Sequence, residues 1–306
     1  MPEPKSRHVA FVEVGPRDGL QNEAKLIATA DKVELIRRAI AAGARRIEVA
    51  SFVNPKRVPQ MADAEAVVAA LGQPAGVTRI GLVLNERGAE RALAAGLDQL
   101  GAVAIASDPF GIRNQGQDSA QSVEVVQRII ALAKAAGRTA QVTIAVAFGC
   151  PFGGEVDPAH VVAMAARLAQ AGPVEVALAD TIGVAVPAQV SALVAAVRQA
   201  IAPLPVRVHF HNTRGTGIAN VWAAVEAGAS VVDASIGGLG GCPFAPGAAG
   251  NVASEDVAYL LARSGVETGL DLGKLIEAAQ WLGGVMDKPM PSMLVRAGGF
   301  PKPESE

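Results

Sequence analysis

The chain has 306 residues, a formal net charge of −2 and 50% hydrophobic residues, with a mean hydropathy of +0.31. This length is enough for one large domain, and the lack of basic or acidic blocks argues against nucleic acid or an anionic membrane surface as a partner. The two cysteines are too far apart to form a disulfide framework, which indicates a cytoplasmic location. We find no signal peptide, and glycine, proline or charges interrupt each apolar run before it could span a membrane.

Eight short runs rich in valine and isoleucine follow one another along the chain. Nearly all of their residues are apolar, which is typical of buried parallel strands. The runs cover residues 8–14, 46–51, 78–84, 100–106, 141–148, 174–180, 206–211 and 230–236. Alanine-rich segments with a helical pattern separate them, at residues 31–43, 86–96, 122–137, 160–172, 187–201 and 216–228. Many of these segments end in Ala-Gly just before the next run, as expected where a helix ends at glycine.

Strands that alternate with helices in this way predict an α/β fold, a (β/α)8 TIM barrel. The rival fold is a doubly wound open sheet, which usually opens with a Gly-rich phosphate turn. The turn here, Gly-Pro-Arg-Asp-Gly from Gly15, does not match that fingerprint. Two more helical segments, 252–265 and 270–285, precede a proline-rich end. We predict a single catalytic domain over residues 1–306, with the barrel at about 8–265 and a short C-terminal helical cap at about 266–306.

In such barrels the active site lies at the C-terminal ends of the strands. His209 and His211 are two residues apart in a predicted strand, so both side chains face the same way. Two imidazoles with a carboxylate and an amide oxygen suit an octahedral divalent cation: oxygen ligands favour Mg²⁺ or Mn²⁺, and imidazoles also suit zinc, cobalt or iron. A hydrogen-bonded histidine pair without metal is the alternative. The carboxylate of Asp180, directly after its strand, could equally be a helix cap.

Several segments resemble the 3-hydroxy-3-methylglutaryl-CoA lyase family, which belongs to a group of metal-dependent barrels that also includes isopropylmalate and homocitrate synthases. The resemblance covers residues 9–284. The GLGGCP loop is specific to the lyase branch, whereas the RDG and H-x-H elements are shared with the wider group. The segments are VEVGPRDGLQNE from Val12, SFVNPKRVPQMAD from Ser51, GCPFGG from Gly149, ADTIG from Ala179, HFHNTRG from His209 and GGLGGCPFAPGAAGN from Gly237.

The resemblance implies a metal-assisted retro-Claisen cleavage. A 3-hydroxy-3-alkylglutaryl-CoA splits into acetyl-CoA and a 3-keto acid, which is acetoacetate for the methyl substrate. It implies that the metal, Mg²⁺ or Mn²⁺, is held by Asp18, His209, His211 and Asn251. It also implies a homo-oligomer, either a dimer or a tetramer, and a role in leucine degradation and ketone-body formation.

The resemblance further implies individual catalytic roles. Arg17 would stabilise the thioester enolate, since a fixed guanidinium suits a developing oxyanion. Cys242, in a glycine-rich loop, would be the general acid/base. Glu48 would be a second acid/base or an orienting group, and Asp180 would support the site by hydrogen bonding. Substrate binding is assigned to Gln21, Asn85, Asn114 and Arg214. Cys150 is expected to be structural.

The chain departs from the family pattern at two places. Asn212-Thr213-Arg214-Gly215 stands where the family usually has Asp-Thr-Tyr-Gly, and Ser107-Asp108-Pro109-Phe110 replaces Ser-Glu-Ser/Thr-Phe. We hypothesise that Arg214 meets an extra or displaced substrate carboxylate, so that Arg214→Tyr shifts preference toward the methyl substrate. Two alternatives to the lyase remain open: a related aldolase or Claisen-type enzyme acting on a different hydroxyacyl-CoA or a 2-keto acid, and a non-catalytic barrel that binds metal or CoA.

Overall fold

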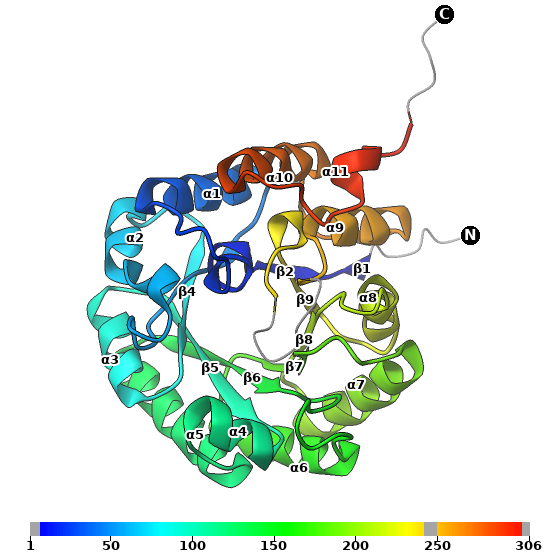
Figure 1. Ribbon diagram of the computed structural model, residues 1–306. Helices are drawn as coiled ribbons and strands as arrows, with labels where there is room; N and C mark the ends of the chain where they lie inside the picture. The colour runs from blue at the N-terminus through cyan, green and yellow to red at the C-terminus, as the bar shows by residue number, and fades with distance from the viewer. Residues whose placement is uncertain (1–6, 242–249, 302–306) are drawn as a thin grey trace, which may run out of the picture.

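The computed structural model describes residues 7–241 and 250–301 of the chain. The eight predicted strands close into a parallel barrel in chain order, from β2 to β9, and Figure 1 shows the helices as a ring around them. The prediction of a TIM barrel is confirmed. The barrel strands are β2 (Ala10–Glu13), β3 (Arg46–Ser51), β4 (Thr78–Val83), β5 (Gln99–Ile105), β6 (Thr139–Ala145), β7 (Val176–Asp180), β8 (Val206–Phe210) and β9 (Val231–Ala234).

The helices that surround the barrel alternate with these strands along the chain, and three short helical turns accompany them. The predicted helical segments are all present, whereas helices α2, α4 and α11 were not predicted individually. The helices are α1 (Thr29–Ala41), α2 (Ala64–Leu71), α3 (Glu86–Ala94), α4 (Asp108–Gln115), α5 (Ser119–Ala135), α6 (Pro158–Ala169), α7 (Pro187–Ile201), α8 (Gly217–Glu226), α9 (Ser254–Arg263), α10 (Leu272–Met286) and α11 (Leu294–Ala297). The turns are the π-helical η1 (Gly15–Gly19) and the 3-10 turns η2 (Pro59–Met61) and η3 (Ile236–Gly238).

Helix α5 shows how the sequence specifies these elements. Its N-terminus is closed by a capping box in which Asp118 and Gln121 each bond to the other's backbone N–H. Its apolar residues recur every three or four positions and are buried, as at Val126 and Ile130. Its last residue, Ala135, lies two positions before Gly137, which has φ +66°, in agreement with the predicted glycine at the helix end. One stripe of the helix therefore packs on the barrel.

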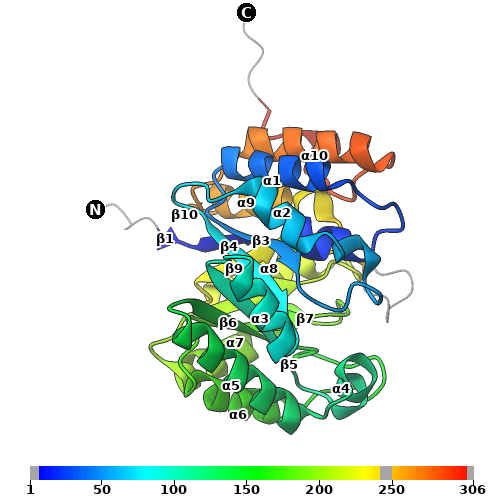
Figure 2. The same cartoon turned by 90° about the vertical axis from the view of Figure 1, so that its left-hand side faces the viewer.

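The C-terminal segment completes the ring of helices. Helix α10 lies beside α1, and both views show the last helices next to the first ones (Figures 1 and 2). A two-residue strand, β1 (Arg7–His8), pairs in parallel with β10 (Val266–Glu267) outside the barrel. These strands were not predicted, because two residues are too short to show a pattern. The division into one domain with a barrel and a cap stays a prediction.

The inside of the barrel carries a largely buried set of charges, which we call the interior charged network (Arg46, Glu175, Arg207 and Asp233). Arg46 donates to both oxygens of Glu175, at 2.7 and 2.8 Å. Arg207 Nε lies 3.1 Å from Glu175 Oε1, and Arg207 Nη1 lies 3.1 Å from Asp233 Oδ2. Two cations alternate with two anions, so the network is electrically balanced. Glu175, Arg207 and Asp233 are buried, and Arg46 is partly exposed.

No helix within the described ranges, 7–241 and 250–301, is both long and apolar enough to cross a membrane.

Candidate active site

A cavity of about 770 Å³ opens at the C-terminal ends of the barrel strands, where TIM-barrel enzymes hold their active sites. The residues predicted from the first, second and seventh strands line it together: Arg17, Asp18, Glu48, His209 and His211. Gln21, Asn85 and Asn114, which were assigned to substrate binding, line it as well. The structure thus brings together residues that lie up to two thirds of the chain apart in sequence.

Arg17 and Asp18 are presented by the π-helical turn η1. The Val14 carbonyl accepts hydrogen bonds from the N–H groups of both residues, at 3.1 and 2.7 Å. The turn is packed so closely that a Cβ on Gly15 would lie 2.6 Å from Glu13 Oε1, and glycine is therefore required there. Oε1 of the buried Glu13 also accepts from the N–H of Gly15 and of Ile236, which ties η1 to η3. This packing fixes the direction of both side chains.

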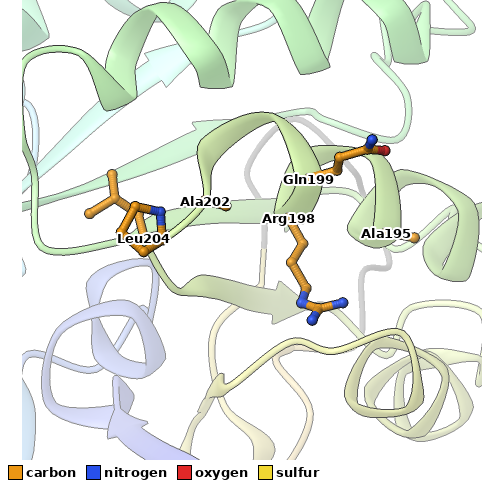
Figure 3. Close-up of a pocket in the computed structure, with 6 residues that line it drawn as sticks. Ala195, Arg198, Gln199, Ala202 and Leu204 are labelled. Atoms are coloured by element: carbon orange, nitrogen blue, oxygen red, sulfur yellow. The ribbon is translucent and has the colours of Figure 1, made fainter.

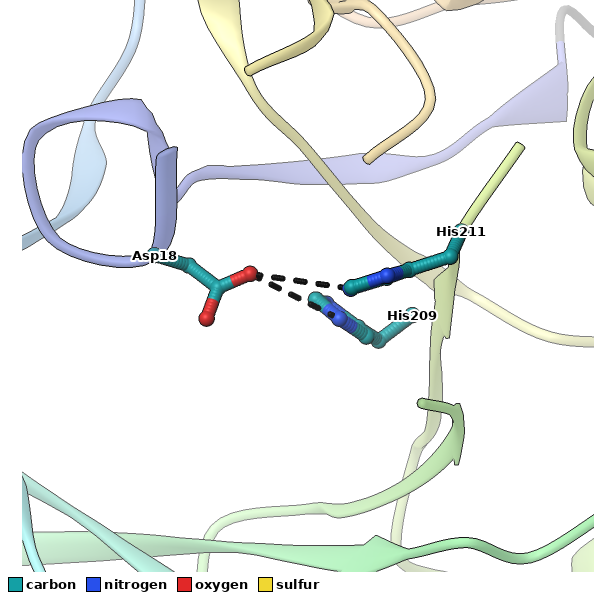
Figure 4. A group of neighbouring side chains, drawn as sticks. All are labelled: Asp18, His209 and His211. Carbon is teal, nitrogen blue, oxygen red and sulfur yellow. Dashed lines mark ion pairs between the residues drawn. The ribbon is translucent and has the colours of Figure 1, made fainter. Parts of the chain in front are cut away.

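Asp18, His209 and His211 form the candidate metal centre. Their ligand atoms all lie within 4.8 Å of one another, and Figure 4 shows the carboxylate of Asp18 facing both rings. The Nε2 atoms of His209 and His211 lie 3.9 and 3.8 Å from Asp18 Oδ2. The predicted convergence of the two histidines on one point is present in the structure.

Asn251, which forms an isolated β-bridge with His211, completes this group. Its Nδ2 donates to Asp18 Oδ2 at 2.8 Å and to the Leu239 carbonyl at 2.8 Å. Its Oδ1 is buried and has no hydrogen-bond partner within residues 7–241 and 250–301. A buried carbonyl oxygen without a partner is costly unless a cation or a ligand takes it. The donor set of one carboxylate, two imidazoles and this free amide oxygen therefore fits a divalent cation.

Arg17 bridges the two carboxylates of the site. Its Nη1 donates to Asp18 Oδ1 at 2.5 Å, and its Nε donates to Glu48 Oε2 at 2.6 Å. Burial alone would raise the pKa of Asp18, but the charges of Arg17 and of the two histidines outweigh it and lower that pKa. Burial alone would likewise lower the pKa of Arg17, yet Asp18 and Glu48 raise it. Both groups are thus held in their charged forms.

Three other predicted site residues lie apart from the cavity or outside the described residues. Asp180 is buried and accepts from the N–H groups of Val184 and Ala185, at 2.9 and 3.0 Å, so it holds the turn after β7. Burial raises the pKa of Asp180. Arg214 is exposed, is absent from the cavity lining and donates to the carbonyls of Ile182 and Gly183. Cys242 lies outside the described residues.

Two residues singled out in the sequence have structural contacts. Asn212 Oδ1 accepts from the N–H of Gly217 at 3.0 Å, at the start of α8. Because an aspartate could accept the same bond, this departure from the family pattern keeps the local turn. Cys150 is buried, and its sulfur accepts from the N–H groups of Phe152 and Gly153, which is consistent with the structural role expected for it.

Four charged residues that line the cavity were given no role from the sequence. Arg207 and Asp233 line the floor of the cavity beneath His209, and Arg57 and Arg113 also line it. Arg207 and Asp233 could have been recognised in the sequence, because each is a charged residue inside an otherwise apolar strand. Such a residue needs a buried partner of opposite charge.

A second cavity, of about 590 Å³, lies beside the C-terminal end of α7 (Figure 3). Arg198 is the one ionisable side chain among the described residues that line it, and the turn at Pro203 leads from it into the N-terminal end of β8. It therefore lies at the barrel end opposite to the candidate metal centre, and the lining residues that the structure describes include no acid, thiol or imidazole.

A closed parallel barrel with a carboxylate, two imidazoles and an amide at its mouth defines a TIM-barrel enzyme with a candidate metal centre. Comparison with known proteins extends this conclusion. The HMGL-like family model matches residues 8–282. The (R)-citramalyl-CoA lyase of Chloroflexus aurantiacus is 44% identical, over 95% of this chain and 95% of the relative. The 3-hydroxy-3-isohexenylglutaryl-CoA/hydroxymethylglutaryl-CoA lyase of Pseudomonas aeruginosa is 42% identical, over 95% and 97%.

Solved structures agree. An HMG-CoA lyase from Acinetobacter baumannii, in complex with coenzyme A and 3-methylmalate, superposes with a TM-score of 0.92 at 37% identity, over 98% of this chain and 100% of that one. The chain belongs to the HMGL-like family and, within the barrel group, to the hydroxymethylglutaryl-CoA lyases. It is a carbon–carbon lyase, and its substrates are CoA thioesters.

Proposed function

We propose that the protein cleaves a 3-hydroxy-3-alkylglutaryl-CoA, with 3-hydroxy-3-methylglutaryl-CoA as the preferred substrate, into acetyl-CoA and a 3-keto acid. The observation that carries this proposal is the contact of Arg17 with Asp18 in one cavity, where Asp18 also faces two imidazoles. The guanidinium of Arg17, which can stabilise an enolate, thus lies beside the side chains that can bind a metal. In a retro-Claisen reaction these two functions are needed within one substrate length of each other.

We assign the metal to Asp18, His209, His211 and Asn251, with Mg²⁺ or Mn²⁺ as the cation. When bound, the cation supplies Lewis acidity, which makes the tertiary hydroxyl of the substrate easier to deprotonate. The free Oδ1 of Asn251 supports this assignment, since its own Nδ2 is already engaged with Asp18.

The chain's own residues then serve the reaction as follows. Loss of the hydroxyl proton forms a carbonyl, the bond between the hydroxyl-bearing carbon and the next methylene breaks, and the electron pair moves onto the thioester as an enolate. Arg17 stabilises the enolate oxygen. A proton returned to the methylene carbon gives acetyl-CoA. We assign the proton transfers to Cys242. Glu48 takes the orienting role, because its Oε2 already accepts from Arg17.

Substrate binding in this proposal uses the remaining walls of the cavity. Leu82, Val103 and Ile105 form an apolar side that suits the alkyl substituent. Gln21, Asn85 and Asn114 supply polar groups for the acyl chain and the thioester arm. Asn85 also caps α3 by accepting from the N–H of Gly88, so its side chain is held in place.

A second candidate substrate is citramalyl-CoA, because the citramalyl-CoA lyase is as similar to this chain as the hydroxymethylglutaryl-CoA lyases are. The same cleavage would then release pyruvate instead of acetoacetate. A homo-oligomeric state, a cytoplasmic location and a role in leucine degradation or ketone-body formation stay proposals; some of the relatives are mitochondrial enzymes.

The test is product analysis with both thioesters in the presence of Mn²⁺. We expect acetyl-CoA with acetoacetate from 3-hydroxy-3-methylglutaryl-CoA, and a lower kcat/KM for citramalyl-CoA. Pyruvate formed from citramalyl-CoA at the higher kcat/KM would move the assignment to the second candidate. Failure to release acetyl-CoA from either thioester would contradict the proposal as a whole.

A further inference from the structure

His209 is held between two carboxylates that come from opposite sides. Its Nε2 faces Asp18, whereas its Nδ1 lies 3.4 Å from Oδ2 of Asp233 on the barrel floor. The strands β8 and β9, which carry His209 and Asp233, are paired neighbours in the barrel. Nδ1 of a neutral imidazole must carry the proton if it is to donate to a carboxylate, and Nε2 is then an unprotonated donor atom for a cation.

We propose that Asp233 is a positioning residue that fixes His209 with Nδ1 protonated and Nε2 free for the metal. The inference rests on the proposed metal site. It goes beyond that site because Asp233 is not one of the proposed ligands and acts on the metal only through His209. A carboxylate behind a ligating imidazole fixes both the ring orientation and the proton position, and losing such a partner typically weakens metal binding by about 10- to 100-fold.

The position of Asp233 is itself fixed by the interior charged network. Arg207 Nη1 contacts both carboxylate oxygens of Asp233, at 3.2 and 3.1 Å, and Arg207 Nη2 donates to Thr143 Oγ1 at 2.8 Å. Asp233 is 4% exposed and Arg207 is 1% exposed. Burial and these contacts hold both side chains in place, so the carboxylate presents Oδ2 to His209.

The neighbouring histidine shows that this support is specific. His211 also directs Nε2 toward Asp18, but its Nδ1 is buried without a hydrogen-bond partner in the part of the chain that the structure describes. A carboxylate therefore orients the imidazole of His209, whereas packing and the metal would orient that of His211. We expect His209 to be the pre-formed ligand of the pair.

The geometry also predicts why asparagine cannot replace Asp233. Both of its oxygens face Arg207 Nη1 and one of them also faces His209 Nδ1. An amide would direct its NH₂ either at the guanidinium, which has no acceptor, or at His209, which would then have to carry its proton on Nε2. Either outcome disturbs the ligand.

The test compares Mn²⁺ affinity, measured by titration calorimetry on the full-length protein, for the wild type, Asp233→Asn and Glu175→Gln. Glu175 is the matched control, because it pairs with Arg207 from the other side and does not contact His209. We expect Asp233→Asn to weaken Mn²⁺ binding by about 10- to 100-fold and Glu175→Gln to retain most of the affinity. Equal losses in both variants would overturn the proposal, since they would reflect the charged network as a whole.

A second measurement needs no variant to fold. Long-range ¹H–¹⁵N spectra of the metal-free wild type, labelled in its four histidines, distinguish the two imidazole tautomers. We expect the Nδ1–H form for His209, and the Nε2–H form would overturn the proposal. If the wild type binds no Mn²⁺ at all, the metal assignment fails, and the tautomer alone then decides whether Asp233 orients His209.

Discussion

Asn251 donates from Nδ2 to Oδ2 of Asp18 at 2.8 Å, although the two residues are 233 positions apart. This bond joins the turn after the first barrel strand to the segment that follows the last one. It also engages Nδ2 of Asn251, whereas Oδ1 has no hydrogen-bond partner among the described residues. Gly240 lies directly against the bond: a Cβ there would lie 2.3 Å from Asn251 Nδ2 and 2.9 Å from the backbone oxygen of Asp18.

We therefore predict that Gly240→Ala disrupts the metal centre. Gly240 has φ +111°, so an alanine adds backbone strain of about 1–3 kcal/mol to the steric clash. Gly96→Ala is the matched control, because Gly96 has φ +80° and no heavy atom within 4 Å of the added Cβ. Calorimetric Mn²⁺ titration should show weakened binding in Gly240→Ala alone, with a lower Tm in both variants. Equal Mn²⁺ affinity in the two variants would show that close packing at Gly240 does not matter.

Arg17→Lys should reduce kcat far more than it changes KM. Lysine keeps the charge but loses the planar fork that contacts Asp18 and Glu48 together. The loss of one oxyanion donor typically costs about 10²- to 10³-fold in kcat. Steady-state kinetics with 3-hydroxy-3-methylglutaryl-CoA measures this effect, and thermal melting checks that the variant is folded. A kcat close to that of the wild type would remove Arg17 from the chemical step.

The buried Glu13 makes stability depend on pH. Burial raises its pKa from the usual 4.5 to about 8, although Ser254 and two backbone N–H groups donate to its carboxyl. The folded protein therefore keeps a proton that the unfolded chain releases above pH 4.5. The contribution of Glu13 to the free energy of unfolding is therefore greatest below pH 4.5, and it falls as the pH rises toward 8. Glu255, with a pKa raised to about 7 by burial, acts in the same direction.

We expect the free energy of unfolding, measured by urea titration, to fall between about pH 5 and pH 8 by an amount on the order of a few kcal/mol. Glu13→Gln should flatten this dependence, because glutamine has the shape of the protonated carboxyl and can serve the same partners. An unchanged slope in Glu13→Gln would show that Glu13 does not titrate in this range.

Arg214 gives a prediction that opposes the sequence-based hypothesis of a substrate contact. Its guanidinium donates to the Ile182 and Gly183 carbonyls and does not line the cavity. We expect Arg214→Tyr to lower stability by about 1 kcal/mol and to leave the ratio of kcat/KM for different acyl chains unchanged. A shift of that ratio toward the methyl substrate would instead support the contact with a substrate carboxylate.

The pattern of apolar runs predicted the whole barrel, because a strand buried on both faces must be apolar along its length. The same rule explains what was missed. Arg207 and Asp233 lie inside such runs, and their roles depend on partners that only the closed barrel brings together. The two-residue pair β1 and β10 carries no periodic pattern at all.

The sequence could identify candidate residues of the site, but it could not predict every hydrogen bond that they make. The H-x-H spacing placed His209 and His211 on one face, and the resemblance supplied Asp18 and Asn251. Neither source could tell which way Arg214 would turn, since a long side chain at a loop can face the cavity or bond to nearby carbonyls. Local hydrogen bonds decided this in favour of the carbonyls.

The most direct measurement is acetyl-CoA release from 3-hydroxy-3-methylglutaryl-CoA by metal-free wild type and Asp18→Asn, before and after addition of Mn²⁺. The carboxylate of Asp18 accepts hydrogen bonds from Arg17 and Asn251 and faces the imidazoles of His209 and His211. Loss of this carboxylate should therefore affect metal binding and catalysis together. We predict Mn²⁺-dependent release by the wild type and a loss of both release and Mn²⁺ binding in a folded Asp18→Asn. Release that is independent of Mn²⁺, or that survives in Asp18→Asn, would contradict the account.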